Sequence, residues 1–209
     1  QITAGPFAPP PDGAATALVG IADYSDLRYR VFSEVGRRLT ARGEWAPAGS
    51  GDYGYRQLVV HAADYRAIGR RDHQSLHLIA EGGFREDGPR SRNAFFLGGS
   101  SRLRGYPSQY LGGERFYRLS AEYLRPLRWD WLRLLAVAQL GGTADDVERR
   151  SPSGVHASIG FGLRIRLSRF VDAEVEFGIA WPLRGGDGPQ AFAGGLGGAM
   201  PAPAPGAPP

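Results

Sequence analysis

Long stretches of alternating apolar and polar residues constrain this chain most. The clearest one covers residues 155–167, where every odd-numbered position is apolar and every even-numbered position is small, polar or charged. Successive side chains of a β-strand point to opposite faces, so this period of two predicts a strand with one apolar face. Similar stretches recur along the sequence. The chain is therefore predicted to be all-β.

Nine stretches are predicted to be strands, and the connections between them are alternately short and long. They cover residues 14–24, 27–42, 55–68, 74–82, 115–126, 131–142, 155–167, 170–183 and 191–200. Tyr and Trp lie near strand ends, and short turns that alternate with long loops are typical of outer-membrane barrels. We predict an antiparallel transmembrane β-barrel of about 8–10 strands. A soluble β-sandwich would bury the apolar face equally well and is the alternative.

Composition sets the domain limits and excludes some functions. Residues 14–200 are predicted to form one barrel domain, 1–13 an N-terminal extension or short strand, and 201–209 a flexible Pro/Ala-rich tail. The absence of cysteine excludes disulfides and thiolate metal sites. The net charge of +4 is spread over alternate strand positions, so no nucleic-acid-binding patch is predicted. No run of apolar residues is long enough for a membrane helix.

The connection between the fourth and fifth predicted strands carries the most unusual motif, FFLGGSSRLRGY at residues 95–106. Long loops in compact folds are usually functional or disordered, and the apolar residues here argue against disorder. We interpret it as a loop that folds into an interior, with glycines that permit tight folding. An exposed hairpin is the alternative. The motif residues are Leu97, Gly98, Gly99, Leu103, Arg104, Gly105 and Tyr106.

The order FFLGG, LRGY, SAEYLRPL, GFGLRIRLS and FGIAWPL resembles the C-terminal barrel half of the bacterial surface antigen superfamily, which includes BamA, TamA and FhaC. The resemblance implies that the loop folds back into the barrel lumen and that Arg104 contacts acidic residues on the wall. Candidate partners are Glu122, Asp172, Glu174 and Glu176. Each carboxylate could instead neutralise Arg118, Arg164 or Arg166. Family members tend to carry Asp before the glycine of the strand after 115–126, whereas Gln139 precedes Leu140 and Gly141 here.

The chain departs from this family in size, because members usually have periplasmic repeat domains and roughly sixteen strands. A closed single-chain barrel needs an even number of strands. Residues 1–7 could supply a tenth strand, the first predicted strand could be an incomplete crossing, or the chain could be a fragment. We expect a miniature form of the barrel.

The last predicted strand is rich in glycine, with Gly194, Gly195, Gly197 and Gly198. Glycine weakens strand pairing and register. In the resembled family the first and last strands form a seam that can open sideways, so these glycines are a candidate lateral seam. The alternative is an end that frays before the Pro-rich tail.

Catalytic motifs are absent, and the chain is not expected to be an enzyme. His156, Ser158 and Glu174 could form a lipid-modifying site, but the expected lumen position of the histidine and serine argues against it. His61, His73 and His77 are spread over two strands and a turn and do not predict a metal site. No cofactor or metal is expected.

The resemblance implies a protein of the bacterial outer membrane that takes part in protein insertion or translocation, or serves as a barrel subunit of an envelope complex. A structural anchor or scaffold barrel without transport is the alternative. Expected partners are outer-membrane lipid and lipopolysaccharide, and other envelope subunits or client proteins.

Overall fold

The structure is a computed structural model, which describes residues 13–30, 32–88, 95–144, 154–167 and 173–197. Every regular element in these ranges is a strand. The strands are β1 Leu18–Ser25, β2 Arg28–Arg30, β3 Ser33–Ala46, β4 Tyr55–Ala67, β5 Ser75–Glu86, β6 Phe95–Leu97, β7 Leu111–Gly113, β8 Arg115–Pro126, β9 Leu132–Ala144, β10 His156–Arg166, β11 Ala173–Pro182 and β12 Gln190–Gly197. The predicted all-β class is confirmed. In the described ranges no helix is long and apolar enough to span a bilayer.

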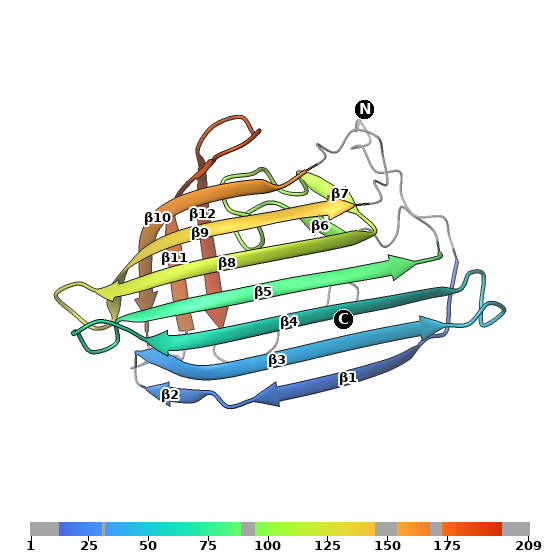
Figure 1. Ribbon diagram of the computed structural model, residues 1–209, viewed down its shortest axis with the longest axis horizontal. Helices are drawn as coiled ribbons and strands as arrows, with labels where there is room; N and C mark the ends of the chain where they lie inside the picture. Colours follow the sequence, from blue (N-terminus) through green and yellow to red (C-terminus); the bar gives the residue numbers. More distant parts are fainter. Residues whose placement is uncertain (1–12, 31, 89–94, 145–153, 168–172, 198–209) are drawn as a thin grey trace.

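Nine strands pair in a single path, β1-β3-β4-β5-β8-β9-β10-β11-β12, and every pairing is antiparallel. β2 pairs with β3 beside this path, and β6 pairs with β7 in a separate two-stranded sheet. Figure 1 shows the large sheet curling around, so that β6 and β7 lie inside the curve between the front strands and β11 and β12. Connections of five to seven residues meet at one end of the sheet. The long β5–β8 and β9–β10 connections lie at the other end, as predicted, together with the shorter β3–β4 and β11–β12 connections.

One predicted strand is wrong, because residues 27–42 do not form a single strand. The chain reverses between Arg30 and Ser33, and β2 pairs back onto the start of β3. The gap between the first two predicted strands, at Ser25 and Asp26, corresponds to a break between β1 and β2. Gly36 lies opposite this break with φ +128°, and a Cβ there would lie 1.9 Å from the Asp26 carbonyl oxygen. Only glycine permits this close approach, which the polarity pattern could not reveal.

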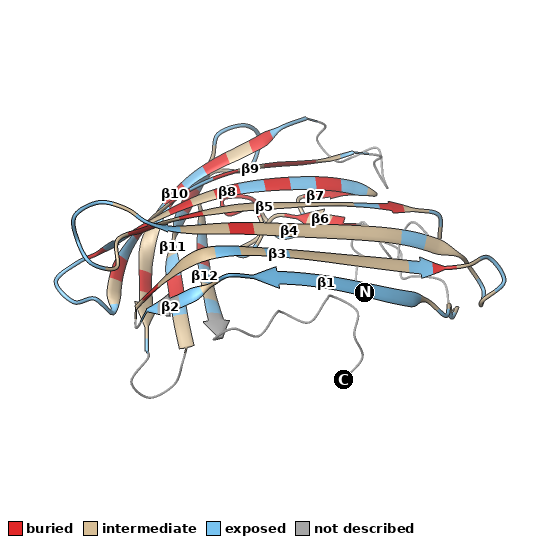
Figure 2. Cartoon of the chain, turned by 60° about the horizontal axis from the view of Figure 1, so that its bottom comes forward, coloured by how far each residue is buried: buried red, intermediate tan, exposed pale blue. Residues whose placement is uncertain are grey.

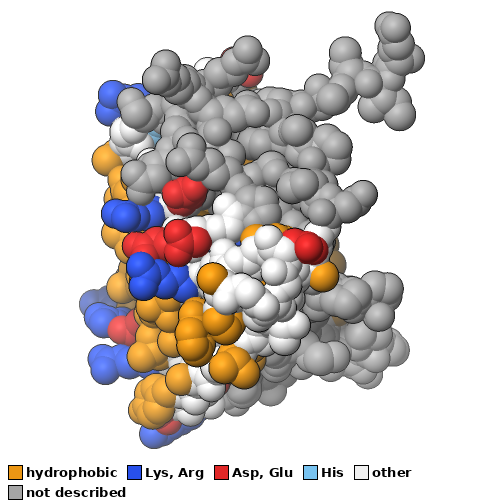
Figure 3. Space-filling view, turned by 90° about the vertical axis from the view of Figure 1, so that its right-hand side faces the viewer, with side chains coloured by type: hydrophobic (Ala, Val, Ile, Leu, Met, Phe, Trp, Pro, Cys, Tyr) orange, Lys and Arg blue, Asp and Glu red, His pale blue; other side chains and the backbone are white. Residues whose placement is uncertain are grey.

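The two faces of the sheet differ in polarity as the alternation predicts. In β10, His156, Ser158 and Arg164 are buried on the concave face, while Ile159 and Phe161 are 40% and 54% exposed on the convex face. Figure 2 shows the same banding of buried and exposed residues along β8 and β9. In the end-on view of Figure 3, hydrophobic side chains gather on the left flank of the described surface, with charged side chains among them. The convex face is thus the apolar one.

Buried apolar side chains form a hydrophobic cluster on the concave face. It consists of Leu124, Leu135, Val137, Ala180 and Phe192. These residues come from β8, β9, β11 and β12, so the cluster fixes the curvature of the second half of the sheet.

The edges of the sheet are β1 and β12, and no pairing joins them within the described ranges. All eight residues of β1 are exposed, as the pale strand in Figure 2 shows. Because directions alternate along nine antiparallel strands, β1 and β12 run the same way. The proposed tenth strand at residues 1–7 and the tail at 201–209 lie outside the described residues. The structure therefore establishes a large antiparallel sheet, and a closed transmembrane barrel remains a prediction.

Leu134 and Leu135 test the assignment of the two faces. Leu135 is fully buried in the cluster and Leu134 is 38% exposed on the convex face. We expect Leu135→Ala to lower the free energy of unfolding in detergent by about 2–5 kcal/mol, because it leaves a cavity among packed side chains. Leu134→Ala is the matched control and should cost much less. Equal losses in denaturant titrations of the two variants would contradict the assignment.

Candidate functional site: a loop held against the concave face

The loop between β5 and β8 folds back against the concave face. β6 and β7 form its base, and its tip turns back on itself through a bridge between Gly99 and Leu103. The Gly99 amide donates a hydrogen bond to the Tyr106 carbonyl over 2.9 Å. The tip is therefore a compact turn with its own backbone hydrogen bonds.

Two glycines of the motif are required by the backbone. Gly98 has φ +123°, and a Cβ there would lie 2.1 Å from the Pro107 carbonyl oxygen. Gly105 has φ +90°, and a Cβ there would lie 3.2–3.3 Å from backbone atoms of Ala180 to Pro182 in β11. Side chains rarely adopt such φ values; a Cβ at Gly98 would clash with the backbone, and one at Gly105 would be tightly packed. The glycines let the tip approach the sheet at backbone distance.

Apolar side chains anchor the loop. Phe95, Leu97, Leu103, Tyr106 and Leu111 of the loop are buried together with Phe116 of β8. The rings of Phe95 and Phe116 lie 4.5 Å apart between centroids. Burial of these side chains supplies the main non-directional stabilisation of the loop.

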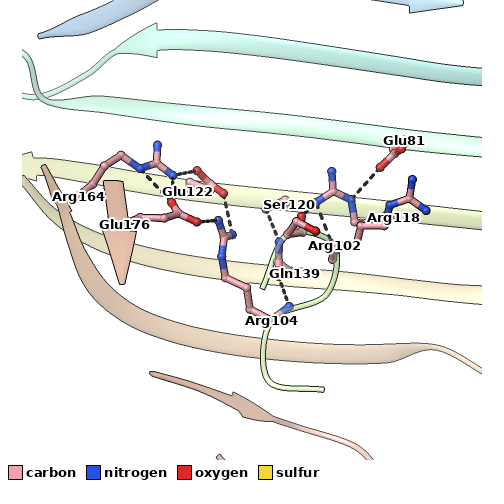
Figure 4. A network of polar contacts seen from close by, with 10 residues as sticks. Glu81, Arg102, Arg104, Arg118, Ser120, Glu122, Gln139, Arg164 and Glu176 are labelled. Carbon is pink, nitrogen blue, oxygen red and sulfur yellow. Dashed lines mark hydrogen bonds and ion pairs between the residues drawn. The ribbon is translucent and has the colours of Figure 1, made fainter. Parts of the chain in front are cut away.

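Arg104 is part of a closed ring of four charged side chains. We call it the charge ring, and its members are Arg104, Glu122, Arg164 and Glu176. Arg104 donates from Nη1 to Glu122 Oε1 over 2.8 Å, and from Nη2 to Glu176 Oε1. Arg164 donates from Nη2 to Glu122 Oε2 and to Glu176 Oε2, both over 2.6 Å. Figure 4 shows both arginines lying between the same two carboxylates. The ring thus joins the loop to β8, β10 and β11.

The charge ring is neutral overall and almost fully buried. The four side chains are between 3% and 7% exposed. Burial disfavours the charged form of Arg104, but Glu122 and Glu176 outweigh that effect, so the pKa of Arg104 is raised above its ordinary value. A buried charge of this kind is stable only while its partners remain in place.

Two further side chains hold the loop backbone. Gln139 of β9 accepts a hydrogen bond from the Arg104 amide over 2.8 Å and donates to Ser120 Oγ over 3.1 Å. Arg118 of β8 donates to the carbonyls of Ser101 and Arg102 over 3.2 and 3.3 Å, and its Nε lies 3.2 Å from Glu81 Oε2. Figure 4 shows these contacts beside the charge ring. The loop is thus fixed through its main chain as well as through Arg104.

Tyr106 connects the loop tip to β10 and to the segment that follows β11. Its hydroxyl lies 2.9 Å from the Ala157 carbonyl and 2.8 Å from the Arg184 carbonyl, so its proton is shared between two acceptors. Burial raises the pKa of Tyr106. Its ring also contacts Tyr110 and His156, with centroids 5.0 and 5.6 Å away.

The structure brings two of the four candidate carboxylates, Glu122 and Glu176, to Arg104. The prediction that Glu174 contacts Arg104 is wrong, because Glu174 pairs with Arg133. It lies two residues before Glu176, which places it about 6.6 Å further along the strand. Asp172 lies outside the described residues. The two alternatives considered for each carboxylate are not exclusive, because Glu122 and Glu176 each contact Arg164 as well as Arg104.

The residues of the considered lipid-modifying site do not come together. His156 pairs with Gly141 and Ser158 with Gln139 on β9, whereas Glu174 pairs with Arg166 on β10, eight residues further along from Ser158. Both His156 and Ser158 are buried on the concave face. Among the described side chains, no group of His, Asp and Glu could hold a metal ion.

The glycines of the last strand lie at the sheet edge. Gly194 and Gly195 pair with Glu176 and Val175 on β11, and Gly197 pairs with Ala173. Gly198 lies outside the described residues. The position of β12 at an edge is compatible with a seam, and opening of that seam stays a prediction.

The contact of Gln139 with the loop backbone was not predicted, and Arg118 and Arg164 were considered only as alternative partners of the carboxylates. The polarity pattern does place all three on the concave face. Their contacts with the loop could not be inferred from polarity. They depend on strand register, which decides which inward-facing residues of neighbouring strands lie side by side.

The described chain is thus an all-β protein with an apolar convex face and a loop held against a polar concave face. The model of the Omp85 superfamily domain matches residues 15–200, and the chain belongs to this superfamily. Its members are outer-membrane proteins of Gram-negative bacteria, so the resemblance is confirmed at the level of the family. The comparison with individual curated proteins found no match.

Replacement of Arg104 tests the charge ring. Arg104→Ala leaves two buried carboxylates facing Arg164 alone, and we expect the free energy of unfolding to fall by about 3–5 kcal/mol. Arg102→Ala is the control, since Arg102 lies in the same loop and donates to the Phe96 carbonyl over 3.1 Å. It should cost only about 1 kcal/mol. Similar losses for both variants in denaturant titration would show that the ring has no special weight.

Gly98 and Gly99 separate the effect of crowding from that of backbone conformation. Both have positive φ, but a Cβ at Gly99 would meet only Ser108, at 3.6 Å. Gly99→Ala should therefore cost about 1 kcal/mol of backbone strain. Gly98→Ala should displace the loop. On gels of samples heated in detergent, it should lower the temperature at which the folded band is lost much more than Gly99→Ala does. A milder effect at Gly98 than at Gly99 would contradict the observed path of the loop.

Proposed function

We propose that this chain is an outer-membrane β-barrel protein that acts as a barrel subunit of an envelope assembly and takes part in the insertion or translocation of other proteins. The observation that carries this proposal is the combination of a locked loop with two unpaired sheet edges. The charge ring joins the loop to the concave face, while β1 and β12 present backbone groups without strand partners in the described ranges. Membership of the Omp85 superfamily supports the membrane location.

Strand direction supports completion of the sheet by other strands. β1 and β12 run the same way, so their direct pairing would be parallel, whereas barrels of this kind are built from antiparallel neighbours. An all-antiparallel closure needs an odd number of additional strands. Two copies of the nine-strand path in the same orientation would again bring parallel edges together. The edges are therefore better suited to strands of a different kind than to a second copy of themselves.

A structural anchor without transport is the second candidate. Its support is the charge ring itself, since a loop that fills the concave face leaves less room for a passing chain. The two functions differ in the partners expected at β1. A client protein would be newly made and transient, whereas a scaffold would hold a stable partner.

A photo-cross-linking residue at Ala22 distinguishes these functions. Ala22 lies in the middle of β1 at the edge, and Ala136 in β9 is the matched interior control. We expect Ala22, but not Ala136, to cross-link to strands of other polypeptides in cells, because only the edge can accept a new strand. Cross-linked partners that disappear during a chase after labelling indicate insertion, and persistent ones a scaffold. Cross-links from Ala22 only to lipid or to β12 of the same chain would contradict both.

A further inference from the structure

The convex face carries an apolar groove that the charge ring and the loop do not use. It has a volume of about 810 Å³ and runs across the strands from β3 to β10. Its floor is formed by outward alanines that pair across neighbouring strands, Ala62 with Ala80 and Ala121 with Ala138. Leu39 and Ile159 stand at its two ends, 46% and 40% exposed. Small side chains flanked by large ones produce the depression.

The dimensions of the groove fit a lipid acyl chain. It crosses six neighbouring strands, a distance of about 24 Å at the usual strand spacing. One leaflet of a bilayer core is about 15 Å thick, so the groove is long enough for one extended chain.

One end of the groove is cationic. Arg37 and Asp64 face each other across β3 and β4, and both contribute to the lining. Arg66 donates two hydrogen bonds to Asp64, over 2.6 and 3.0 Å, whereas Arg37 Nε lies 3.7 Å away from Asp64. The Arg37 side chain is 72% exposed, and its ion pair to Asp64 within the described residues runs through Nε. Two arginines around one aspartate leave a net positive charge and unused donors.

This cationic end lies toward the short-turn end of the sheet, where positive charge is in excess. In the described ranges, exposed arginines at this end outnumber exposed aspartates by six to three. The arginines are Arg28, Arg30, Arg70, Arg71, Arg125 and Arg128, and the aspartates are Asp26, Asp72 and Asp130. The stacked rings of Trp129 and Trp131 lie at the same end, 5.5 Å apart. Aromatic and basic side chains together mark the level of lipid headgroups.

We propose that this groove binds one anionic glycerophospholipid, with the phosphate on Arg37 and Arg66 and one acyl chain over the alanine floor. The proposal rests on the proposed function, because it requires the convex face to meet lipid. Arginine forks match phosphate oxygens, and Asp64 orients Arg66 without cancelling the second positive charge.

Native mass spectrometry of the full chain in detergent tests the site, with phosphatidylglycerol and phosphatidylethanolamine of identical acyl chains as probes. We expect one retained phosphatidylglycerol per chain, in preference to phosphatidylethanolamine. Removal of one arginine near an anionic headgroup should weaken retention about fivefold. Arg37→Gln with Arg66→Gln should therefore abolish the preference, and Ala80→Trp should reduce retention of both lipids by filling the groove.

The control variants are Arg125→Gln and Ala136→Leu, which make similar changes on the convex face outside the groove. Arg125 lies about 13 Å along β8 from Ala121. Both controls should retain phosphatidylglycerol like the unmodified chain. Equal retention of the two lipids by the unmodified chain, or an unchanged preference in the double variant, overturns the proposal.

A gel-shift measurement on the same samples separates this proposal from the proposed function. A folded, heat-modifiable protein without lipid preference rejects the lipid site alone. Absence of a heat-modifiable fold in the unmodified chain rejects the membrane barrel and with it the lipid site.

Discussion

The charge ring of Arg104, Glu122, Arg164 and Glu176 is the interaction on which the rest of the structure depends. Each of its charges is buried, and a buried charge is tolerated only when oppositely charged groups surround it. The ring meets this condition because its members come from the loop and from three strands of one curved sheet. The loop cannot leave without exposing two carboxylates to a single arginine. Loop position and sheet curvature are thus coupled.

This coupling explains why the two faces of one sheet serve different purposes. The concave face is polar because it must bind a loop through Arg118, Gln139 and the charge ring. The convex face is apolar although nothing in the described chain covers it, a combination that suits a lipid environment. The edges form a third kind of surface, with backbone groups that have no strand partner in the described ranges and can pair with another strand. The alternation of residues therefore assigns the polar and the apolar face, whereas the order of the strands assigns the edges.

Much of this organisation could be predicted from the sequence. The nine strands of the path overlap the nine predicted stretches, and the alternation in residues 155–167 gave the correct faces of β10. The reversal between Arg30 and Ser33 was missed, because it depends on backbone contact at Gly36 and not on polarity. Among the acids, Glu122 and Glu176 contact Arg104, and Glu174 does not. A period of two determines which face of the sheet a side chain occupies. It does not determine the register, and so it does not tell which acid lies beside Arg104.

The sequence by itself determined the class of the fold, the two faces of the sheet and the identity of the inserted loop, because these depend on local periodicity and on residue types such as glycine. Only the tertiary structure decided which charges meet, that Gln139 caps the Arg104 amide, and that β1 and β12 lie at the edges running the same way. The physical reason is strand register. A shift of two residues keeps every side chain on its face but exchanges its neighbours, and the sequence of one strand does not contain that information.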